Sequence, residues 1–262
     1  MKRMIRVLAL AAWLSPLLAY SADEVKLIRA NSSIGSKYGF TWQNTGFDVK
    51  VKDLGYEKSV SIRYRDADGS WRDSALSFSR KAEEGREIWT GNIGRYRSQD
   101  GQPLSPIDLE YAIRYTVNGT DYWDNNQGAN YRMAANAGEN LYGVEVYNNA
   151  YYPVNNYFYG NLLGGTVVLR NIAPHKEVQV HYSIDNWQTV KVAQAQYSQW
   201  YWMGQYAHVD NPSPTGFEIW SYYLDVGSAN QVEYAIKYKV DGQTYWDNNF
   251  GRNYRTTLLR PS

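Results

Sequence analysis

The sequence has no cysteine, and other features that would point to particular chemistries are also scarce. The absence of cysteine excludes disulfide frameworks, zinc ribbons and cysteine nucleophiles. Charge is balanced, because 27 Lys and Arg stand against 26 Asp and Glu, for a formal net charge of +1. A chain this close to neutral has no field to attract nucleic acid or an acidic membrane surface. The histidines at 175, 181 and 208 lack metal-ligand spacing, so we expect no metal and no cofactor.

Aromatic side chains that carry a polar group are abundant, with 25 Tyr and 10 Trp but only 6 Phe. Such rings suit a solvated binding surface as well as a core. Hydrophobic residues make up 44% of the 262 positions, which is enough for packed cores. The length fits two modest domains or one large one.

The start of the chain has the pattern of a secretory signal peptide. Lys2, Arg3 and Arg6 precede an apolar run from Val7 to Leu18, and Ala19-Tyr20-Ser21 has the small-x-small form of a cleavage site. The apolar run is too short to span a bilayer well, and no other stretch approaches that length. We therefore expect cleavage near Ser21 and a secreted or periplasmic mature protein.

The chain contains an internal repeat. Leu109 to Met133 (LEYAIRYTVNGTDYWDNNQGANYRM) aligns without a gap to Val232 to Thr256 (VEYAIKYKVDGQTYWDNNFGRNYRT), and about two-thirds of the positions are identical. A spacing of about 120 residues is that of whole domains rather than of a solenoid. The predicted organisation is a signal peptide over 1–21, a first domain over 24–133, a polar linker over 134–140 and a second domain over 141–258.

Each copy shows the period-two alternation of antiparallel strands. Val60, Ile62 and Tyr64 alternate with polar residues in copy one, and the same pattern recurs in copy two. Asn118-Gly119 and Asp241-Gly242 are hairpin-turn dipeptides between strand-like runs. Several short strands per copy and no convincing helix predict an all-β protein with two tandem antiparallel β-sandwich domains. The residues on the apolar stripe, expected in the cores, include Tyr111, Tyr115, Tyr234 and Tyr238.

The ending Y-W-D-N-N-x-G-x-N-Y occurs in both copies, and a K-x-V-x-V/I-x-Y strand followed by a turn and a Trp precedes it each time. Together these motifs resemble carbohydrate-binding module family 21. That family holds the starch-binding domain found beside fungal glucoamylases and the glycogen-targeting subunits of protein phosphatase 1. The resemblance covers about residues 24–133 and 141–258. It implies immunoglobulin-like β-sandwiches that bind α-1,4-glucans, such as starch, glycogen or maltooligosaccharides, without cleaving them.

The resemblance also implies sugar-binding residues. Those of the family's first site are Trp71, Trp123, Asn125 and Asn130 in copy one, and Trp187, Trp246, Asn248 and Asn253 in copy two. A third aromatic of that site is replaced here by Ala112 and Ala235. The second site begins with Tyr56 and Lys58 in copy one and with His175 and Lys176 in copy two, where His replaces the Tyr. Its remaining aromatics come from a variable loop, with these candidates: Trp89 and Tyr96, or Tyr197, Trp200, Tyr201, Trp202 and Tyr206.

These residue types suit an uncharged polyol. Pyranose rings present C–H faces to flat aromatic side chains and hydroxyl edges to Asn side chains, which both donate and accept. Neighbours on a strand point to opposite faces, so one of Tyr122 and Trp123 should be buried and the other exposed. Asp124 and Asp247 are expected to orient the Asn loop.

No catalytic arrangement is evident, and we expect no enzyme. A glycosidase needs two carboxylates about 5 to 9.5 Å apart, whereas the repeated motif offers one Asp among amides. Asp66-Ala67-Asp68-Gly69 opens like a calcium loop but lacks the closing Glu, so a turn is expected. The main alternative function is a secreted protein-interaction or adhesion sandwich with a repurposed surface. A phosphatase-targeting subunit is opposed by the export signal, and an unlinked amylolytic enzyme is a candidate partner.

Overall fold

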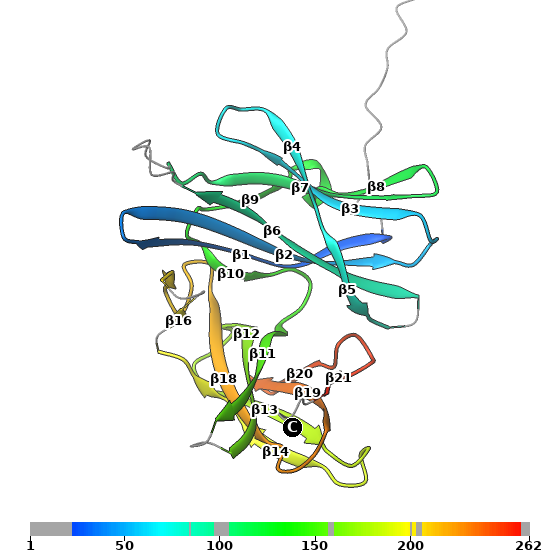
Figure 1. The fold of residues 1–262 in the computed structure, drawn as a ribbon, viewed down its shortest axis with the longest axis vertical. Helices are drawn as coiled ribbons and strands as arrows, with labels where there is room; N and C mark the ends of the chain where they lie inside the picture. Colours follow the sequence, from blue (N-terminus) through cyan, green and yellow to red (C-terminus); the bar gives the residue numbers. More distant parts are fainter. Residues whose placement is uncertain are drawn as a thin grey trace, which may run out of the picture.

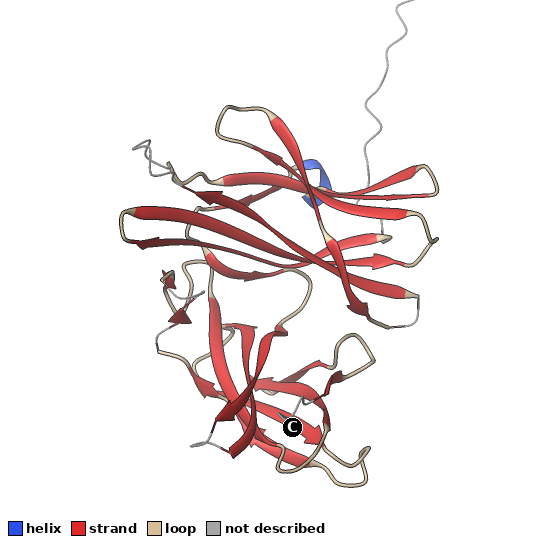
Figure 2. Cartoon of the chain, in the orientation of Figure 1, coloured by secondary structure: helices blue, strands red, loops and turns tan. Residues whose placement is uncertain are grey.

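Two β-sandwich modules follow each other along the chain in the computed structural model (Figure 1). The structure describes residues 23–83, 85–96, 105–156, 160–199, 201–202 and 206–257, so the expected signal peptide over 1–21 and Trp200 lie outside it. Strands dominate, as Figure 2 shows, and a short 3-10 turn at Asn126–Gly128 interrupts them. The predicted all-β fold class is confirmed. Among the described residues, none forms a helix with the length and apolar character needed to span a bilayer.

The first module consists of two antiparallel sheets. One has the order β10 (Gly138–Leu141), β1 (Val25–Lys37), β2 (Phe40–Lys52), β6 (Arg86–Tyr96), β5 (Ser77–Lys81). The other has the order β4 (Trp71–Ala75), β3 (Lys58–Arg65), β7 (Leu109–Val117), β8 (Thr120–Asp124), with β9 (Tyr131–Met133) also paired to β7. Figure 1 shows the β1–β2 sheet facing the second module and the β3–β7 sheet on the far side.

The second module repeats this pairing order. Its first sheet is β11 (Val146–Asn156), β12 (Gly160–Arg170), β18 (Phe217–Asp225), β15 (Gln196–Tyr197). Its second sheet is β14 (Lys191–Gln194), β13 (Lys176–Ser183), β19 (Gln231–Val240), β20 (Gln243–Asp247), with β21 (Tyr254–Thr257) paired to β19. A separate two-stranded sheet is formed by β16 (Tyr201–Trp202) and β17 (His208–Val209).

Each sandwich has its own apolar core between its two sheets. The expected core tyrosines are confirmed, because Tyr111, Tyr115, Tyr234 and Tyr238 are fully buried. Since side chains alternate across a strand, the residues between these tyrosines point to the outer face of the same sheet. The outer faces of β7, β8, β19 and β20 therefore carry the candidate sugar residues.

The two modules share an interface rather than a free linker. β10 pairs with β1, from Arg29↔Leu141 to Ser32↔Gly138, so residues 138–140 of the expected linker form a strand of the first sheet. An apolar cluster crosses the junction and consists of Ile28, Leu141, Tyr147, Val168, Phe217 and Ile219, all buried. The buried Glu139 on β10 accepts from Arg29 on β1 at 2.7 Å, and this ion pair holds the two strands together, because an unpaired carboxylate there would be costly.

Candidate functional site

Both copies of the Y-W-D-N-N motif close into the same loop. In copy one Asn126, Gln127 and Asn130 have φ of 51°, 58° and 57°, and in copy two the corresponding values are 53°, 52° and 52°. Asn enters this left-handed region more readily than most residues, which explains its repetition in the motif. Copy two places Phe250 at a left-handed position, where a bulky side chain is strained.

The motif aspartates bind these loops to the first strand of each module. Asp124 accepts from the Leu27 backbone N–H at 2.8 Å and from the Tyr131 hydroxyl at 2.9 Å. Asp247 makes the same bonds in copy two, to the Asn148 backbone at 2.5 Å and the Tyr254 hydroxyl at 2.7 Å, and it also accepts from the Asn249 backbone N–H. Both carboxylates are buried, and burial raises the pKa of Asp247. As expected, these aspartates orient the loop.

Each motif asparagine of copy one uses one of the two polar atoms of its side-chain amide in a hydrogen bond within the protein. Asn125 Oδ1 accepts from the Gly128 N–H at 3.0 Å, and Asn130 Nδ2 donates to Glu110 at 2.9 Å. Among the described residues, Asn125 Nδ2 and Asn130 Oδ1 have no partner. One donor and one acceptor therefore remain for a ligand.

Copy two repeats this arrangement with Asn248 capping Gly251 and Asn253 bonded to Glu233, both at 2.9 Å. An equivalent donor and acceptor thus remain there. Burial acts to raise the pKa of Glu233, but hydrogen bonds from Asn253, Arg255 and Trp187 outweigh burial and lower this pKa. The Glu233 carboxylate therefore stays ionised beside the site.

The tyrosine and the tryptophan of each motif point to opposite faces, as predicted. Tyr122 packs against the core, whereas Trp123 lies on the outer face with the Arg114 guanidinium 5.7 Å from its ring. In copy two Tyr245 packs inward, and Trp246 is 50% exposed with the Lys237 ammonium 5.6 Å from its ring. A flat ring held by a cation beneath or beside it is a suitable surface for stacking a pyranose.

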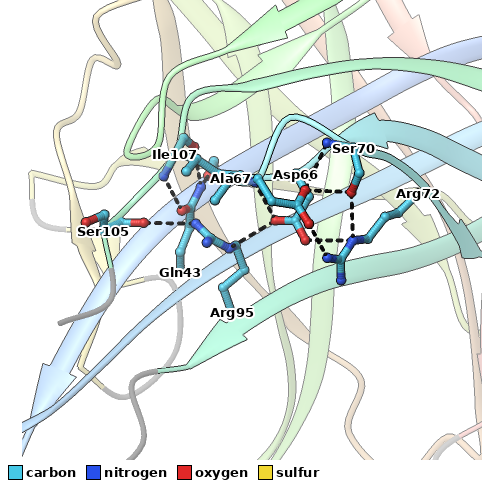
Figure 3. Close-up of polar contacts among 10 residues, drawn as sticks. Gln43, Asp66, Ala67, Ser70, Arg72, Arg95, Ser105 and Ile107 are labelled. Carbon is cyan, nitrogen blue, oxygen red and sulfur yellow. Dashed lines mark hydrogen bonds and ion pairs between the residues drawn. The ribbon is translucent and has the colours of Figure 1, made fainter. Parts of the chain in front are cut away.

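Trp71 begins β4 after a tight turn that Figure 3 shows in detail. The Asp66 carboxylate forms ion pairs with Arg72 Nε at 3.0 Å and Arg95 Nε at 3.8 Å, and Figure 3 labels these three residues. Gly69 has a φ of 80°. The Asp66 N–H donates to the Ser70 carbonyl at 2.8 Å and the Gly69 N–H to the Asp66 carbonyl at 2.9 Å, so the stretch is a turn, as expected. The described residues contain no cluster of three or more His, Cys, Asp or Glu able to hold a metal ion.

Trp71 and Trp123 share the outer face of one sheet but do not stack on each other. Trp71 lies opposite Arg65, whereas Trp123 lies opposite Arg114, which itself pairs with Ser61. The offset of four positions between Ser61 and Arg65 corresponds to about 13 Å along β3. Trp71 is 40% exposed and Trp123 is half-buried, so the two rings lie apart on one surface rather than forming one compact pocket.

In copy two the site includes a residue that the sequence pattern did not single out. The His181 ring lies edge-on to Trp246 with centroids 5.1 Å apart, and His181 pairs with Ala235, the position where the family has its third aromatic. Its signal in the sequence was only its outward register on β13. Trp187 lies in the turn between β13 and β14 with a φ of 66°, and its backbone N–H donates to Ser183 Oγ at 2.8 Å.

A second candidate site lies at the other end of the first module, in a cavity of about 750 Å³. The structure brings Tyr56, Lys58 and Trp89 together in its lining, as expected. Tyr56 is 98% exposed, and Trp89 packs edge-on against Phe78 at 6.2 Å. Phe78 was not identified from the sequence, because a short edge strand has no pattern to mark it.

The buried Glu87 organises the wall of this cavity. It accepts from Lys58 at 3.1 Å, Lys81 at 2.6 Å and the Trp89 indole N–H at 3.0 Å. Burial raises its pKa, but these bonds outweigh burial, and the net pKa of Glu87 is lowered. Lys58 also bonds to Asp53, so its ammonium is committed to carboxylates. The lysine therefore supports the position of Trp89.

This charged wall predicts how the first module responds to acid. Hydrogen bonds from Lys58 and Lys81 lower the pKa of Asp53 from 3.8 to about 2. The stabilisation is complete above the unfolded pKa, near 3.8, and is lost as pH falls through about 2. Melting temperatures of the chain and of Asp53→Asn between pH 2 and 7 should differ at pH 5 and converge towards pH 2. A constant difference down to pH 2 would contradict this role.

The second module repeats the lysine–glutamate–tryptophan arrangement, but His175 stands in place of Tyr56. Lys176 bonds to Glu218 at 2.9 Å and to Asn171 at 2.6 Å, and Glu218 accepts from the Trp220 indole at 2.9 Å. Tyr197 packs edge-on against Trp220 at 6.1 Å. His175 is exposed, and no ring contact joins it to Trp220 or Tyr197 within the part of the chain that the structure describes.

The remaining loop candidates do not join this arrangement. Tyr206 lies against Trp42 of the first module, with ring centroids 6.4 Å apart. The side chains of Tyr96, Tyr201 and Trp202 lie outside the described residues.

A family model for the carbohydrate/starch-binding module of family 21 matches the chain twice, over residues 43–134 and 150–257. The chain belongs to this family. Both matches contain the loops, tryptophans and lysine–glutamate walls described above. The two sandwiches are thus tandem family 21 modules.

Relatives of this family 21 chain are longer than it. The Bos taurus protein phosphatase 1 regulatory subunit 3B is 36% identical over 93 residues, covering 36% of this chain and 31% of that protein. The Drosophila melanogaster glycogen-binding subunit 76A is 32% identical over 95 residues, covering 35% of this chain and 12% of that protein. The chain therefore matches less than a third of the length of these curated relatives.

Solved structures of single modules are also similar. The starch-binding domain of Rhizopus oryzae glucoamylase, in complex with beta-cyclodextrin and maltoheptaose, is 26% identical, covering 44% of this chain and 95% of that chain with a TM-score of 0.32. The carbohydrate-binding module of the muscle glycogen-targeting subunit of protein phosphatase-1 is 21% identical, covering 45% of this chain and 78% of that chain with a TM-score of 0.31.

Proposed function

We propose that the chain is an exported, non-catalytic α-glucan-binding protein that holds starch, glycogen or maltooligosaccharides with both modules. The observation that supports this most is the repeated surface on the outer face of β8 and β20. There, as far as the described residues extend, an outward tryptophan stands beside a loop with one unpaired amide donor and one unpaired acceptor in each copy. A ring for the sugar face and amides for its hydroxyls are what a neutral polyol requires.

The assigned roles follow from this chemistry. Trp71, Trp123, Trp187 and Trp246 stack against sugar rings, and the motif asparagines bind hydroxyls. Tyr56 and Trp89, and in copy two His175 and Trp220, form a second contact in each module. The name of the Bos taurus relative refers to a phosphatase, but the expected signal peptide opposes such a partner, and we propose the glucan alone.

Affinity electrophoresis tests the proposal. The protein should be retarded in native gels containing glycogen or soluble starch and should migrate freely in gels containing a β-glucan. Equal migration in all gels would reject α-glucan binding and favour the protein-interaction alternative.

The tandem arrangement predicts avidity for polymers. Each stacked ring contributes on the order of 1 kcal/mol, so a single site is weak. Two modules on one chain raise the effective local concentration of the second site, and the gain is about tenfold to several hundredfold. Silencing one module with Trp123→Ala, or the other with Trp246→Ala, should cost the intact chain this factor on glycogen and much less on maltotriose. Equal losses on both ligands would show that the modules bind separately.

A further inference from the structure

A cavity of about 440 Å³ lies between the two modules, and neither module contains it alone. The first module contributes Ser79 and Arg80 from β5, and the second contributes the end of the Y-W-D-N-N loop, including Asn253 and Arg255. Figure 1 shows β5 descending towards the loop between β20 and β21. The volume falls in the range of about 300–1,000 Å³ typical of small-ligand sites.

The cavity is held open by contacts across the junction. Arg80 Nε donates to Asn249 Oδ1 at 2.7 Å and Arg80 Nη2 donates to the Tyr147 hydroxyl at 2.8 Å. The Lys50 ammonium lies 4.3 Å from the centre of the Phe250 ring. These contacts bring first-module atoms to one side of the second module's loop.

Comparison of the two copies shows what this docking changes. Asn126 and Gln127 are exposed in copy one, whereas Asn249 is buried and Phe250 is half-buried in copy two. The loops have the same backbone conformation, so the difference comes from the neighbouring module. Packing against the first module also offsets the strain of Phe250 at φ 52°.

The groups left unpaired in the cavity are suited to hydroxyls. Within the described part of the chain, Arg80 Nη1, Ser79 Oγ and Asn253 Oδ1 have no hydrogen-bond partner, which leaves donors and an acceptor around one space. Arg255 is neutralised by Glu233 at 2.6 Å, and the field of Arg80 is offset by the buried Asp247 and Asp48. The cavity therefore favours a neutral polyol over a strong anion. Among the described residues that line it, the aromatic one is the buried Tyr254, so the cavity binds by hydrogen bonds rather than by stacking.

The cavity also adjoins the first sugar site of copy two. Asn253 belongs to both, and through Glu233 it is linked to Trp187. We propose that the cavity is an additional glucan subsite built by both modules, which takes a glucosyl unit further along a chain bound at Trp187 and Asn253. This inference rests on the proposed function and extends it, because it makes the two modules one continuous binding unit.

Blocking the cavity without disturbing the fold tests the subsite. Ser79 and Ser77 are both exposed on β5, but only Ser79 lines the cavity. Ser79→Tyr fills the space, and Ser77→Tyr adds the same ring elsewhere on the same strand. Both would be placed in the full chain carrying Trp71→Ala, Trp123→Ala and Tyr56→Ala, so that binding reports the second module.

Titration calorimetry with maltoheptaose and with maltose gives the readout. Ser79→Tyr should weaken maltoheptaose binding about tenfold, the effect of one or two lost neutral hydrogen bonds, and leave maltose binding unchanged. Ser77→Tyr should bind both ligands as tightly as the parent, which is the chain with the silenced first module. The parent and its two tyrosine variants should melt at the same temperature.

Several outcomes would overturn the inference. Unchanged maltoheptaose binding in Ser79→Tyr would show that the cavity takes no sugar. Displacement of maltoheptaose by millimolar inorganic phosphate, lost in Ser79→Tyr, would mean that the cavity is an anion site instead. If the unsubstituted chain binds glycogen but the variant with the silenced first module does not bind maltoheptaose, the subsite fails, and α-glucan binding stands for the first module alone. If the unsubstituted chain binds no α-glucan, the proposed function fails as well.

Discussion

Replacing Trp123 and Trp246 together with alanine is expected to abolish retention on glycogen and starch while leaving both sandwiches folded. The two rings lie on outer faces, and their neighbours there include the cations of Arg114 and Lys237 and the ring of His181. Losing such contacts costs the fold only about 1 kcal/mol each. Retardation in glycogen gels should disappear, while far-UV circular dichroism should be unchanged and the melting temperature should fall by a few degrees.

The matched control uses the residues that precede these tryptophans on the same strands. Tyr122→Ala with Tyr245→Ala removes rings that pack against the cores and against Tyr115 and Tyr238 at 5.9 and 5.8 Å. This pair should lower the melting temperature more than the tryptophan pair does, because these half-buried rings pack against the cores, and deletion of a fully buried aromatic ring costs about 3–5 kcal/mol. An unfolded Trp123→Ala/Trp246→Ala protein would mean that the tryptophans are structural.

Separating the modules is expected to destabilise both. A cut at residue 138 divides β10, which pairs with β1, and opens the apolar cluster that includes Ile28, Tyr147 and Phe217. Burial of each such large side chain contributes about 1.5–3 kcal/mol. The free energy of unfolding of a domain is only about 5–15 kcal/mol, so exposing several of these side chains at once would remove most of it. Residues 22–138 and 139–262 should therefore melt well below the full chain, or fail to express as soluble protein.

A point substitution in the full chain checks the same interface. Phe217→Ala should lower the melting temperature and increase amide hydrogen exchange in β10 and β11, on both sides of the junction. Halves that melt at the temperature of the full chain would show that the interface contributes little. Avidity must accordingly be measured in the full chain with one module silenced.

The repeat and the strand pattern carried most of the fold prediction. Alternation is a local property of the sequence, and burial of one face enforces it, so the period-two pattern alone assigned the tyrosines at 111, 115, 234 and 238 to the cores. The same rule correctly placed Tyr122 and Trp123 on opposite faces, although both rings are half-buried and Trp123 is not exposed as expected. The left-handed Asn126 and Asn249 are also fixed locally, because their side chains donate to backbone carbonyls of the same loop.

Other parts of the site depend on residues far apart in the sequence. Phe78 meets Trp89 only because β5 pairs with β6, and Glu87 binds Lys58 only because two sheets meet at that edge. His181 reaches Trp246 through a strand register that no local pattern marks. The polar stretch over 134–140 indicated a linker, yet pairing with Arg29 and β1 turned part of it into a strand.

The sequence by itself determined the class of fold, the duplication and the outward tryptophans with their asparagine loops. These follow from period-two burial and from hydrogen bonds between residues close along the chain. Only the tertiary structure decided how the modules meet, which loop is buried at the junction, and that Arg80 of one module borders the sugar loop of the other. Such contacts join residues more than a hundred positions apart, and their free energy depends on complementary surfaces that no local pattern encodes.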